Sequence, residues 1–191
     1  QRQMCIRDRH ISKELYPLSY KEFLRFRSLT PCAESFMEYL RDGGFPEFVR
    51  TGNQDVLTAL FDDILYRDIA VRYGIRDVVS LKALLLYLAA NFGNLASANK
   101  LAGMVGIKTG KTALEYLSYF EEAYFISRMP KFSWSLKAQY VNPQKIYFID
   151  TALSQAVTVS FTGNTGHMLE NVVYWELRRR YRQLYYFSEN N

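Results

Sequence analysis

The chain has 191 residues and a formal net charge of +5; 49% of its residues are hydrophobic and 16% are aromatic. This supply of apolar side chains suffices for one large or two small buried cores, and it excludes an intrinsically disordered chain. The longest apolar run, residues 84–92, is far shorter than the ~20 residues that span a bilayer. Because the N-terminus also lacks the apolar core of a secretory signal, we expect a cytoplasmic protein without membrane contact.

The first nine residues, QRQMCIRDR, differ in character from the remainder. Their MCIRDR run resembles translated adaptor sequence at the end of an open reading frame, so we exclude residues 1–9 from the prediction of the fold. This segment carries three arginines and one aspartate, which leaves +3 for the rest of the chain. A weakly basic domain of this size is compatible with nucleic-acid binding but does not require it.

The N-terminal third is predicted to be helical. Ser19 is placed to cap a helix over 19–26, with Glu22 completing a capping box. A second helix, 33–41, ends at a pair of glycines, which suits the positive φ of a helix C-terminus. A longer helix over 54–73 carries apolar residues near helical spacing along one face.

The next part of the chain has the order of a winged helix-turn-helix. Leucines recur at helical spacing from residue 81, and a short helix capped by Ser97 follows. A third helix begins at Thr109, and its apolar residues again keep helical spacing. Two strands, 124–129 and 132–136, then complete the order helix, short helix, turn, helix and two-stranded ribbon.

The C-terminal part mixes strands and helices. It is predicted to contain strands at 146–149 and 184–187 and helices at 152–157 and 167–181. A strand–helix–strand unit with a single amphipathic helix cannot bury both faces of its sheet. We therefore expect the chain to end inside a domain.

One short segment resembles a phosphate-binding P-loop only superficially. In GIKTGKT, residues 106–112, three residues separate Gly106 from Gly110, whereas the P-loop has four between its first glycine and Gly-Lys. The segment also follows a helix rather than a strand. We interpret it as a turn that enters a helix and predict no nucleotide binding there.

Basic side chains at the same place favour a contact with DNA. Lys108, Lys111 and Thr112 are predicted to lie on the exposed side of the first turn of the recognition helix, where phosphates or base edges would be approached. Arg128 and Lys131 are predicted to lie on or beside the wing. Glutamates on the same helix favour the alternative of a solvated charged face that contacts protein, and both alternatives stay open.

Three other charged positions have ordinary structural explanations. Asp150 ends a strand and precedes a helix, which is typical of an N-cap. Glu170 is expected in the first turn of the helix over 167–181, where the helix dipole favours a carboxylate. Residues 178–180 are arginines, and the dipole favours cations at this end of the same helix.

The sequence predicts neither a metal site nor a catalytic nucleophile. His10 and His167 are the only histidines and lie far apart in the chain. Cys5 and Cys32 are too few and too isolated for a disulfide framework. No spacing of these residues matches a zinc site or a Ser-His-Asp set.

Several short segments, taken in order, resemble the C-terminal region of a prokaryotic AAA-like P-loop ATPase family, a region whose function is unknown. Together they run from about residue 11 to the end of the chain. The matching segments are LYPLSYKEF (15–23), GGFPE (43–47), ILYRDIAVRY (64–73), EEAYF (121–125), KIYFIDTAL (145–153) and LENVVYWELRRR (169–180).

This resemblance implies a P-loop ATPase domain before Tyr16, with residues 11–15 as its last strand, and binding of ATP and Mg²⁺ only there. It also implies that the last segment begins a restriction-endonuclease-like fold of the PD-(D/E)XK type, in which Glu170 matches the acidic residue of the first helix. The other catalytic residues would lie beyond Asn191. One carboxylate cannot position a divalent cation, so we expect neither enzyme activity nor a cofactor in this fragment.

The Tyr66-Arg67-Asp68 run carries part of the resemblance but no recognisable chemistry. We interpret Arg67 and Asp68 as an interdomain pair on a long helix that packs against the ATPase domain or its neighbours. The alternative is an arginine that acts on the nucleotide of a neighbouring subunit.

The predicted fold is therefore α+β and mostly helical: a helical linker, a winged helix-turn-helix and an incomplete α/β restriction-endonuclease-like unit. The expected divisions are an artefactual tail (1–9), the end of the ATPase domain with the helical linker (10–77), a winged-helix domain (78–140) and a truncated nuclease-like domain (141–191). The expected function is a non-catalytic accessory module of a bacterial ATP-binding protein that contacts double-stranded DNA or a protein partner, including a second copy. The alternatives are part of a metal-dependent nuclease and a purely protein-binding regulatory module.

Overall fold

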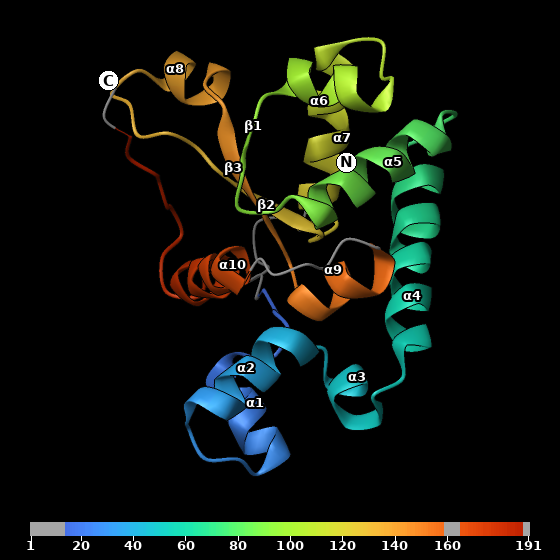
Figure 1. The fold of residues 1–191 in the computed structure, drawn as a ribbon. Coiled ribbons are helices and arrows are strands. Elements are labelled where there is room, and N and C mark those ends of the chain that lie inside the picture. Colours follow the sequence, from blue (N-terminus) through green and yellow to red (C-terminus); the bar gives the residue numbers. More distant parts are fainter. Residues whose placement is uncertain (1–13, 159–164, 189–191) are drawn as a thin grey trace, which may run out of the picture.

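Residues 14–158 and 165–188 are described by the computed structural model, and they form an α+β fold that is mostly helical, as predicted. The tail expected at 1–9, His10 and most of the strand expected at 11–15 lie outside the described residues. A small sheet lies at the centre, and helices surround it (Figure 1).

The N-terminal part is helical, as the sequence predicts. Its first helix begins with the predicted capping box, because the Ser19 side chain accepts from the Glu22 backbone while the Glu22 side chain accepts from the Ser19 backbone. A short helix at Pro46, a favoured first residue of a helix, was not predicted. The elements are α1 (Tyr20–Arg27), α2 (Ala33–Asp42), α3 (Pro46–Thr51), α4 (Gln54–Asp63) and the π-helix η2 (Ile64–Val71).

The long helix predicted over 54–73 is found as α4 continued by η2. Its buried stripe consists of four residues spaced by four: Leu57, Phe61, Leu65 and Ile69. Residues spaced by four drift around an α-helix of 3.6 residues per turn, and the wider π turn keeps the later ones on the core side. The same widening leaves residues 66–68 exposed on the opposite side.

The central part contains α5 and the helix pair that the sequence predicts. Ser97 and Thr109 cap the two helices of this pair by accepting from the backbone N–H three residues later. The three strands form one antiparallel sheet in the order β1-β3-β2. The elements are α5 (Val78–Ala90), β1 (Leu95–Ala96), α6 (Ala98–Val105), α7 (Gly110–Glu122), β2 (Ile126–Met129), α8 (Leu136–Val141) and β3 (Gln144–Phe148).

The strand predicted at 132–136 is wrong. The partner of β2 is β3, with Ile126 opposite Phe148 and Met129 opposite Lys145. The alternation of aromatic residues and serines in FSWSL imitates the period of a strand. The Ser135 side chain instead accepts from the Ala138 N–H and begins α8, because a serine hydroxyl can start a helix as readily as it can face solvent from a strand.

Two further helices, α9 (Thr151–Val157) and α10 (Thr165–Arg178), complete the described chain. α9 lies between α4 and α10 (Figure 1). β3 follows the boundary expected at 140/141 but pairs with β1 and β2, which precede that boundary, so the sheet joins the two segments. The strand predicted at 184–187 is reduced to a parallel bridge between Lys131 and Tyr186.

α10 is fixed to the end of β3 by side-chain hydrogen bonds. The Asn171 amide donates to the Phe148 carbonyl at 2.8 Å and accepts from the Phe148 N–H at 3.0 Å. The Trp175 indole N–H donates to the same carbonyl at 2.6 Å. These bonds satisfy the backbone N–H and carbonyl of the last residue of β3, and they fix the position of α10 against the sheet.

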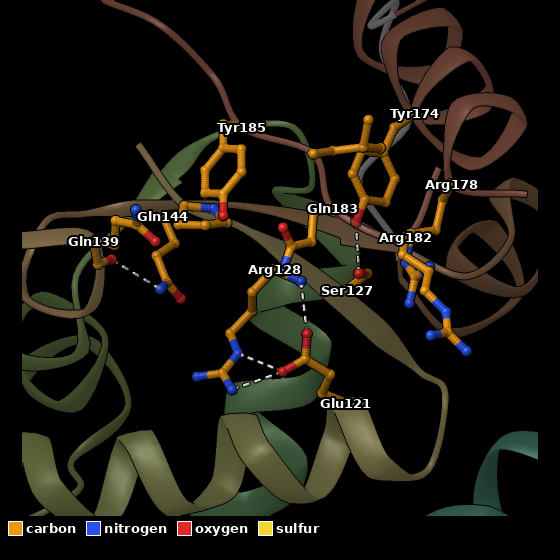
Figure 2. Close-up of a pocket in the computed structure, with 12 residues that line it drawn as sticks. Glu121, Ser127, Arg128, Gln139, Gln144, Tyr174, Arg178, Arg182, Gln183 and Tyr185 are labelled. Carbon is orange, nitrogen blue, oxygen red and sulfur yellow. Dashed lines mark hydrogen bonds and ion pairs between the residues drawn. The ribbon is translucent and has the colours of Figure 1, made fainter. Parts of the chain in front are cut away.

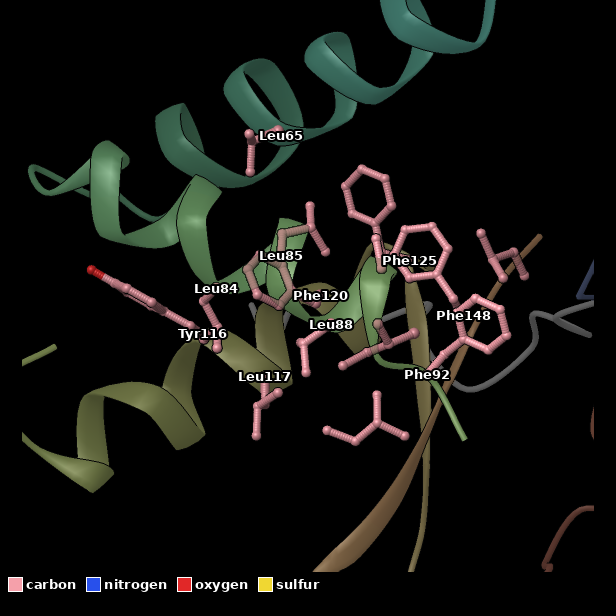
Figure 3. Packing of buried hydrophobic residues seen from close by; sticks show 14 of the residues in the cluster. Leu65, Leu84, Leu85, Leu88, Phe92, Tyr116, Leu117, Phe120, Phe125 and Phe148 are labelled. Atoms are coloured by element: carbon pink, nitrogen blue, oxygen red, sulfur yellow. The ribbon is translucent and has the colours of Figure 1, made fainter. Parts of the chain in front are cut away.

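One hydrophobic core spans most of the chain, with a small second cluster of Phe23, Tyr39 and Val49 in the N-terminal helices. Side chains from η2, α5, α7 and β3 converge on the main core (Figure 3). At its centre the Phe125 ring lies between Phe61, at 5.3 Å between ring centroids, and Phe148, at 6.1 Å. The core therefore includes residues from both sides of the boundary expected at 140/141.

A buried carboxylate connects the N-terminal helices to α9. Asp150 is 5% exposed; one carboxylate oxygen accepts from the Leu153 N–H at 3.0 Å, as the predicted N-cap, and the other from the Gly44 N–H at 2.6 Å. Gly43 has a φ of 63°, and a Cβ there would lie 2.3 Å from the carboxylate. Burial raises the pKa of Asp150 to about 6, against the three backbone N–H groups, which lower it.

Replacement of Asp150 by alanine should therefore destabilise the fold more than loss of an ordinary cap. We expect Asp150→Ala to lower the free energy of unfolding by about 2–4 kcal/mol, because the Gly44 N–H loses its partner as well as α9 its cap. Asp77 caps α5 on an exposed helix end, so Asp77→Ala should cost only about 1 kcal/mol. Urea denaturation of both variants measures this, and equal losses would contradict the connecting role.

Asp150 should also make stability fall as the pH rises from acid to neutral. Its pKa is about 6 in the folded chain and 3.8 ordinarily, so between these values the folded state binds more protons. The extra stability that protonation of Asp150 gives the folded state is therefore complete below pH 3.8 and is lost as the pH rises through 6. In all it amounts to on the order of 3 kcal/mol in the free energy of unfolding. Urea denaturation from pH 4 to about 7.5 should show this loss in the wild type relative to Asp150→Asn. Parallel pH profiles would refute it.

Candidate functional site

Three of the residues predicted to contact DNA lie at or just before the start of α7. Thr109 caps the helix by accepting from the Thr112 N–H at 3.1 Å, and the two threonine hydroxyls lie 3.0 Å apart. Lys108 and Lys111 are exposed on either side of this cap. The sequence therefore gathers two cations and a hydroxyl pair at the positive end of a helix dipole, where phosphate oxygens are favoured.

Gly110 has a packing role within the GIKTGKT segment. A Cβ at this position would lie 1.9 Å from the side-chain oxygen of Asn99, an exposed residue on α6, so a larger residue would require the Asn99 side chain to move. The glycine that imitates a P-loop thus lies where α7 begins beside α6.

Exposed side chains of mixed character surround this turn. Lys100 on α6 is exposed and adds a cation, whereas Glu115 on α7 adds a carboxylate. Met104 and Leu114 are exposed apolar side chains, at 49% and 44%. The surface therefore offers charge for an anion and apolar area for a protein.

Arg128 and Lys131 lie elsewhere. The Arg128 guanidinium donates two hydrogen bonds to one Glu121 oxygen, at 2.6 and 2.8 Å, and its backbone N–H donates to the other at 3.0 Å. Glu121 follows Lys111 by ten residues, or about 15 Å along the axis of α7. Lys131 lies at the bridge to Tyr186. The structure thus groups Lys108, Lys111 and Thr112, and places Arg128 at the opposite end of the helix.

Glu170 lies in the second turn of α10, because the helix begins at Thr165, before the start expected at residue 167. One of its oxygens accepts from the Lys145 ammonium and from the Tyr147 hydroxyl, each at 2.7 Å. Burial, the largest effect, raises the pKa of Glu170, but these hydrogen bonds outweigh it, and the pKa lies below its ordinary value. No group of three or more metal-ligating residues occurs in the described ranges.

Removal of the Lys145 ammonium should move the Glu170 titration toward neutral pH. In Lys145→Gln we expect the pKa of Glu170 to rise, because burial then acts with one charge-assisted hydrogen bond fewer. Titration of the Glu170 carboxyl by NMR measures this, and Lys100→Gln, an exposed lysine on α6, is the control. An unchanged titration in Lys145→Gln would show that the ion pair does not hold the carboxylate.

The residues expected at an interdomain contact are exposed. Arg67 approaches Asp63, one helical turn earlier, at 3.6 Å rather than its neighbour Asp68. The side chain of Arg67 is 77% exposed, so this ion pair contributes little to stability. The hydroxyl of the neighbouring Tyr66 accepts a hydrogen bond from the Lys82 ammonium at 3.2 Å.

A polar hollow that the sequence does not predict lies where β2, α8 and α10 meet. It has a volume of about 350 Å³, and its lining includes Arg178, Arg182 and three glutamine side chains (Figure 2). A second hollow of about 650 Å³ shares Arg178 and Arg182 with it. The helix dipole alone accounts for arginines near the end of α10, so only the convergence of distant segments indicates a site here.

No helix of the described residues is long and apolar enough to span a membrane. A family model for a domain of unknown function, DUF8612, matches residues 33–164. The chain is 32% identical over 194 residues to an uncharacterized protein of Methanocaldococcus jannaschii, an alignment that covers 92% of this chain and 43% of the relative.

An uncharacterized protein of Haemophilus influenzae is 29% identical over 183 residues, which cover 90% of this chain and 46% of that relative. The chain therefore spans less than half the length of these two curated relatives. No solved structure matches the chain.

Proposed function

We propose that this chain, which belongs to the DUF8612 family of domains of unknown function, is a non-catalytic accessory module that contacts double-stranded DNA through the first turn of α7. The carrying observation is the exposed pair Lys108 and Lys111 beside the Thr109–Thr112 cap. A helix N-terminus flanked by two exposed lysines is suited to DNA phosphates.

The arrangement of elements supports a winged helix as the scaffold. The order is α5, β1, α6, α7, β2, α8, β3, and β3 lies between the other two strands in the sheet. Apart from the inserted α8, this order suits a helix-turn-helix backed by a small sheet. In such a scaffold the second helix of the pair, here α7, approaches the major groove with its N-terminal residues. The exposed lysines lie at that end.

The ATPase connection is a proposal that rests on the sequence resemblance. The two curated relatives are more than twice as long as the segment they share with this chain, which leaves room for a P-loop domain in such proteins. The module would then link ATP hydrolysis in that domain to a bound duplex. ATP and Mg²⁺ would bind the other domain, since the GIKTGKT segment lacks the spacing of a P-loop.

A protein-binding role is the second candidate, and a specific observation favours it. Met104 and Leu114 are exposed near the lysines, with Glu115 on the same helix, and this mixture is typical of a protein contact. The nuclease alternative rests on the resemblance alone. Its one matching carboxylate, Glu170, is held by Lys145 and Tyr147.

Fluorescence anisotropy with a labelled duplex of about 20 base pairs tests the proposal. Wild-type affinity should fall steeply from about 50 to 200 mM salt. Lys108→Glu with Lys111→Glu should weaken binding at least about tenfold and reduce the slope of log K against log salt by about 1.8, because two phosphate contacts are lost.

The matched control makes the same change of charge on the N-terminal helices. Lys21→Glu with Arg50→Glu, exposed on α1 and α3, should retain nearly all of the affinity. If both double variants weaken binding equally, net charge alone is responsible and the α7 site is wrong. If the wild type does not bind duplex DNA at low salt, and Met104→Ala with Leu114→Ala abolishes a protein contact, the protein-binding role replaces it.

A further inference from the structure

Three exposed aromatic rings form a row away from the lysines of α7. The Tyr185 ring contacts Phe132 at 6.0 Å between centroids, and Phe132 contacts Trp134 at 5.3 Å, both edge to face. The exposed fractions are 39% for Tyr185, 41% for Phe132 and 94% for Trp134. An indole this exposed gains almost nothing from burial, so the fold does not account for it.

The backbone holds this aromatic row in place. The Phe132 N–H donates to the Tyr186 carbonyl at 2.8 Å, and the Tyr186 N–H donates to the Pro130 carbonyl at 3.1 Å. Two segments more than fifty residues apart in the chain are thereby paired. The row is a fixed surface feature rather than three independent side chains.

The aromatic row adjoins the polar hollow at β2, α8 and α10. Tyr185 lines the hollow together with Arg178 and Arg182, and Figure 2 shows Gln183 between Tyr185 and the two arginines. Gln144 lies on the Tyr185 side of the same hollow. Stacking surfaces, planar amides and guanidinium groups are therefore continuous.

The arginines in and beside the hollow differ in how fully carboxylates neutralise them. Arg128 and Arg180 are neutralised by Glu121 and Glu176, at 2.6 and 2.5 Å. Arg178 has only a long contact with Glu14, at 3.8 Å. Arg182 forms no ion pair with a carboxylate of residues 14–158 or 165–188. The hollow therefore retains positive charge beside the aromatic row.

We propose that the aromatic row and the hollow together bind single-stranded nucleic acid. Unpaired bases stack on Trp134 and Phe132, and phosphates meet Arg178 and Arg182. Stacking tolerates any base because every base has a π-face, and a basic groove beside the rings follows the backbone. A duplex is excluded from stacking there because its bases already stack on one another, which separates this surface from the proposed duplex contact of α7.

Tryptophan fluorescence gives a direct measurement on the whole chain. The chain has two tryptophans. Trp175 is 8% exposed and its indole N–H is bonded to Phe148, so its emission reports the fold. Titration with oligo(dT) or oligo(rU) of about 12 nucleotides should quench the Trp134 emission, and the two titrations distinguish DNA from RNA. The equivalent duplex and inorganic polyphosphate should leave it unquenched.

Two variants separate stacking from charge. Trp134→Ala should weaken oligonucleotide binding, measured by anisotropy of the labelled strand, about fivefold to a hundredfold. Arg182→Gln should weaken it for all sequences and reduce the slope of log K against log salt by about 0.7. Met37→Ala and Arg50→Gln, exposed changes on α2 and α3, are the matched controls and should bind as the wild type does.

Wild-type affinity in Trp134→Ala, or equal binding of polyphosphate and oligonucleotide, would overturn the proposal. Concentration-dependent self-association that Trp134→Ala abolishes, without quenching by oligonucleotide, would assign the row to a contact between copies. The proposal of duplex binding at α7 and that of single-strand binding at the aromatic row can be refuted independently. Lys108→Glu with Lys111→Glu should leave single-strand quenching unchanged, and Trp134→Ala should leave duplex binding unchanged.

Discussion

The arrangement of the whole chain depends on the buried carboxylate of Asp150. Its two oxygens accept backbone N–H groups from segments more than a hundred residues apart, at Gly44 and Leu153. A carboxylate desolvated this fully is costly unless every lone pair that faces the protein has a donor. Gly43 makes the approach possible, because any Cβ there would collide with the carboxylate. Two of the short segments that carry the family resemblance, GGFPE and KIYFIDTAL, thus meet at one hydrogen-bonded contact.

The same end of β3 also positions the C-terminal part, again through hydrogen bonds. Asn171 and Trp175 place three hydrogen bonds on the backbone of Phe148, two residues before Asp150. The N-terminal helices and α10 are therefore both positioned by the end of β3 and the two residues that follow it. This explains why the hydrophobic core is continuous across a boundary that the element pattern alone placed at 140/141.

Internal ion pairs decide which cations can meet a ligand. Arg128 and Arg180 are matched by carboxylates of their own neighbourhood, so they contribute little field beyond it. Lys108, Lys111 and Arg182 are exposed cations that form no ion pair with a carboxylate of the described residues. The two surfaces proposed for binding follow this difference in pairing rather than the formal net charge.

The periodicity and capping residues of the sequence predicted most helices, because a cap and an apolar stripe are local properties. Ser19, Ser97, Thr109 and Asp150 each begin a helix where the pattern placed one. Local patterns failed where the choice depends on distant partners, as in the connection between β2 and β3. FSWSL alternates like a strand, yet the strand that pairs with β2 begins only at Gln144, because β3 supplies the buried residues that the core needs.

The grouping of the lysines at the start of α7 could also be predicted from local sequence, because Lys108, Lys111 and Thr112 lie within five consecutive residues. The ion pair of Arg128 was not foreseeable as a limit on DNA contact, because it depends on how β2 returns along α7. By itself the sequence determined most of the helices, their caps and the mostly helical α+β class. Only the tertiary structure decided which strands pair, which charges cancel, and that Trp134, Tyr185 and Arg182 lie on one surface, because each requires segments that only folding brings together.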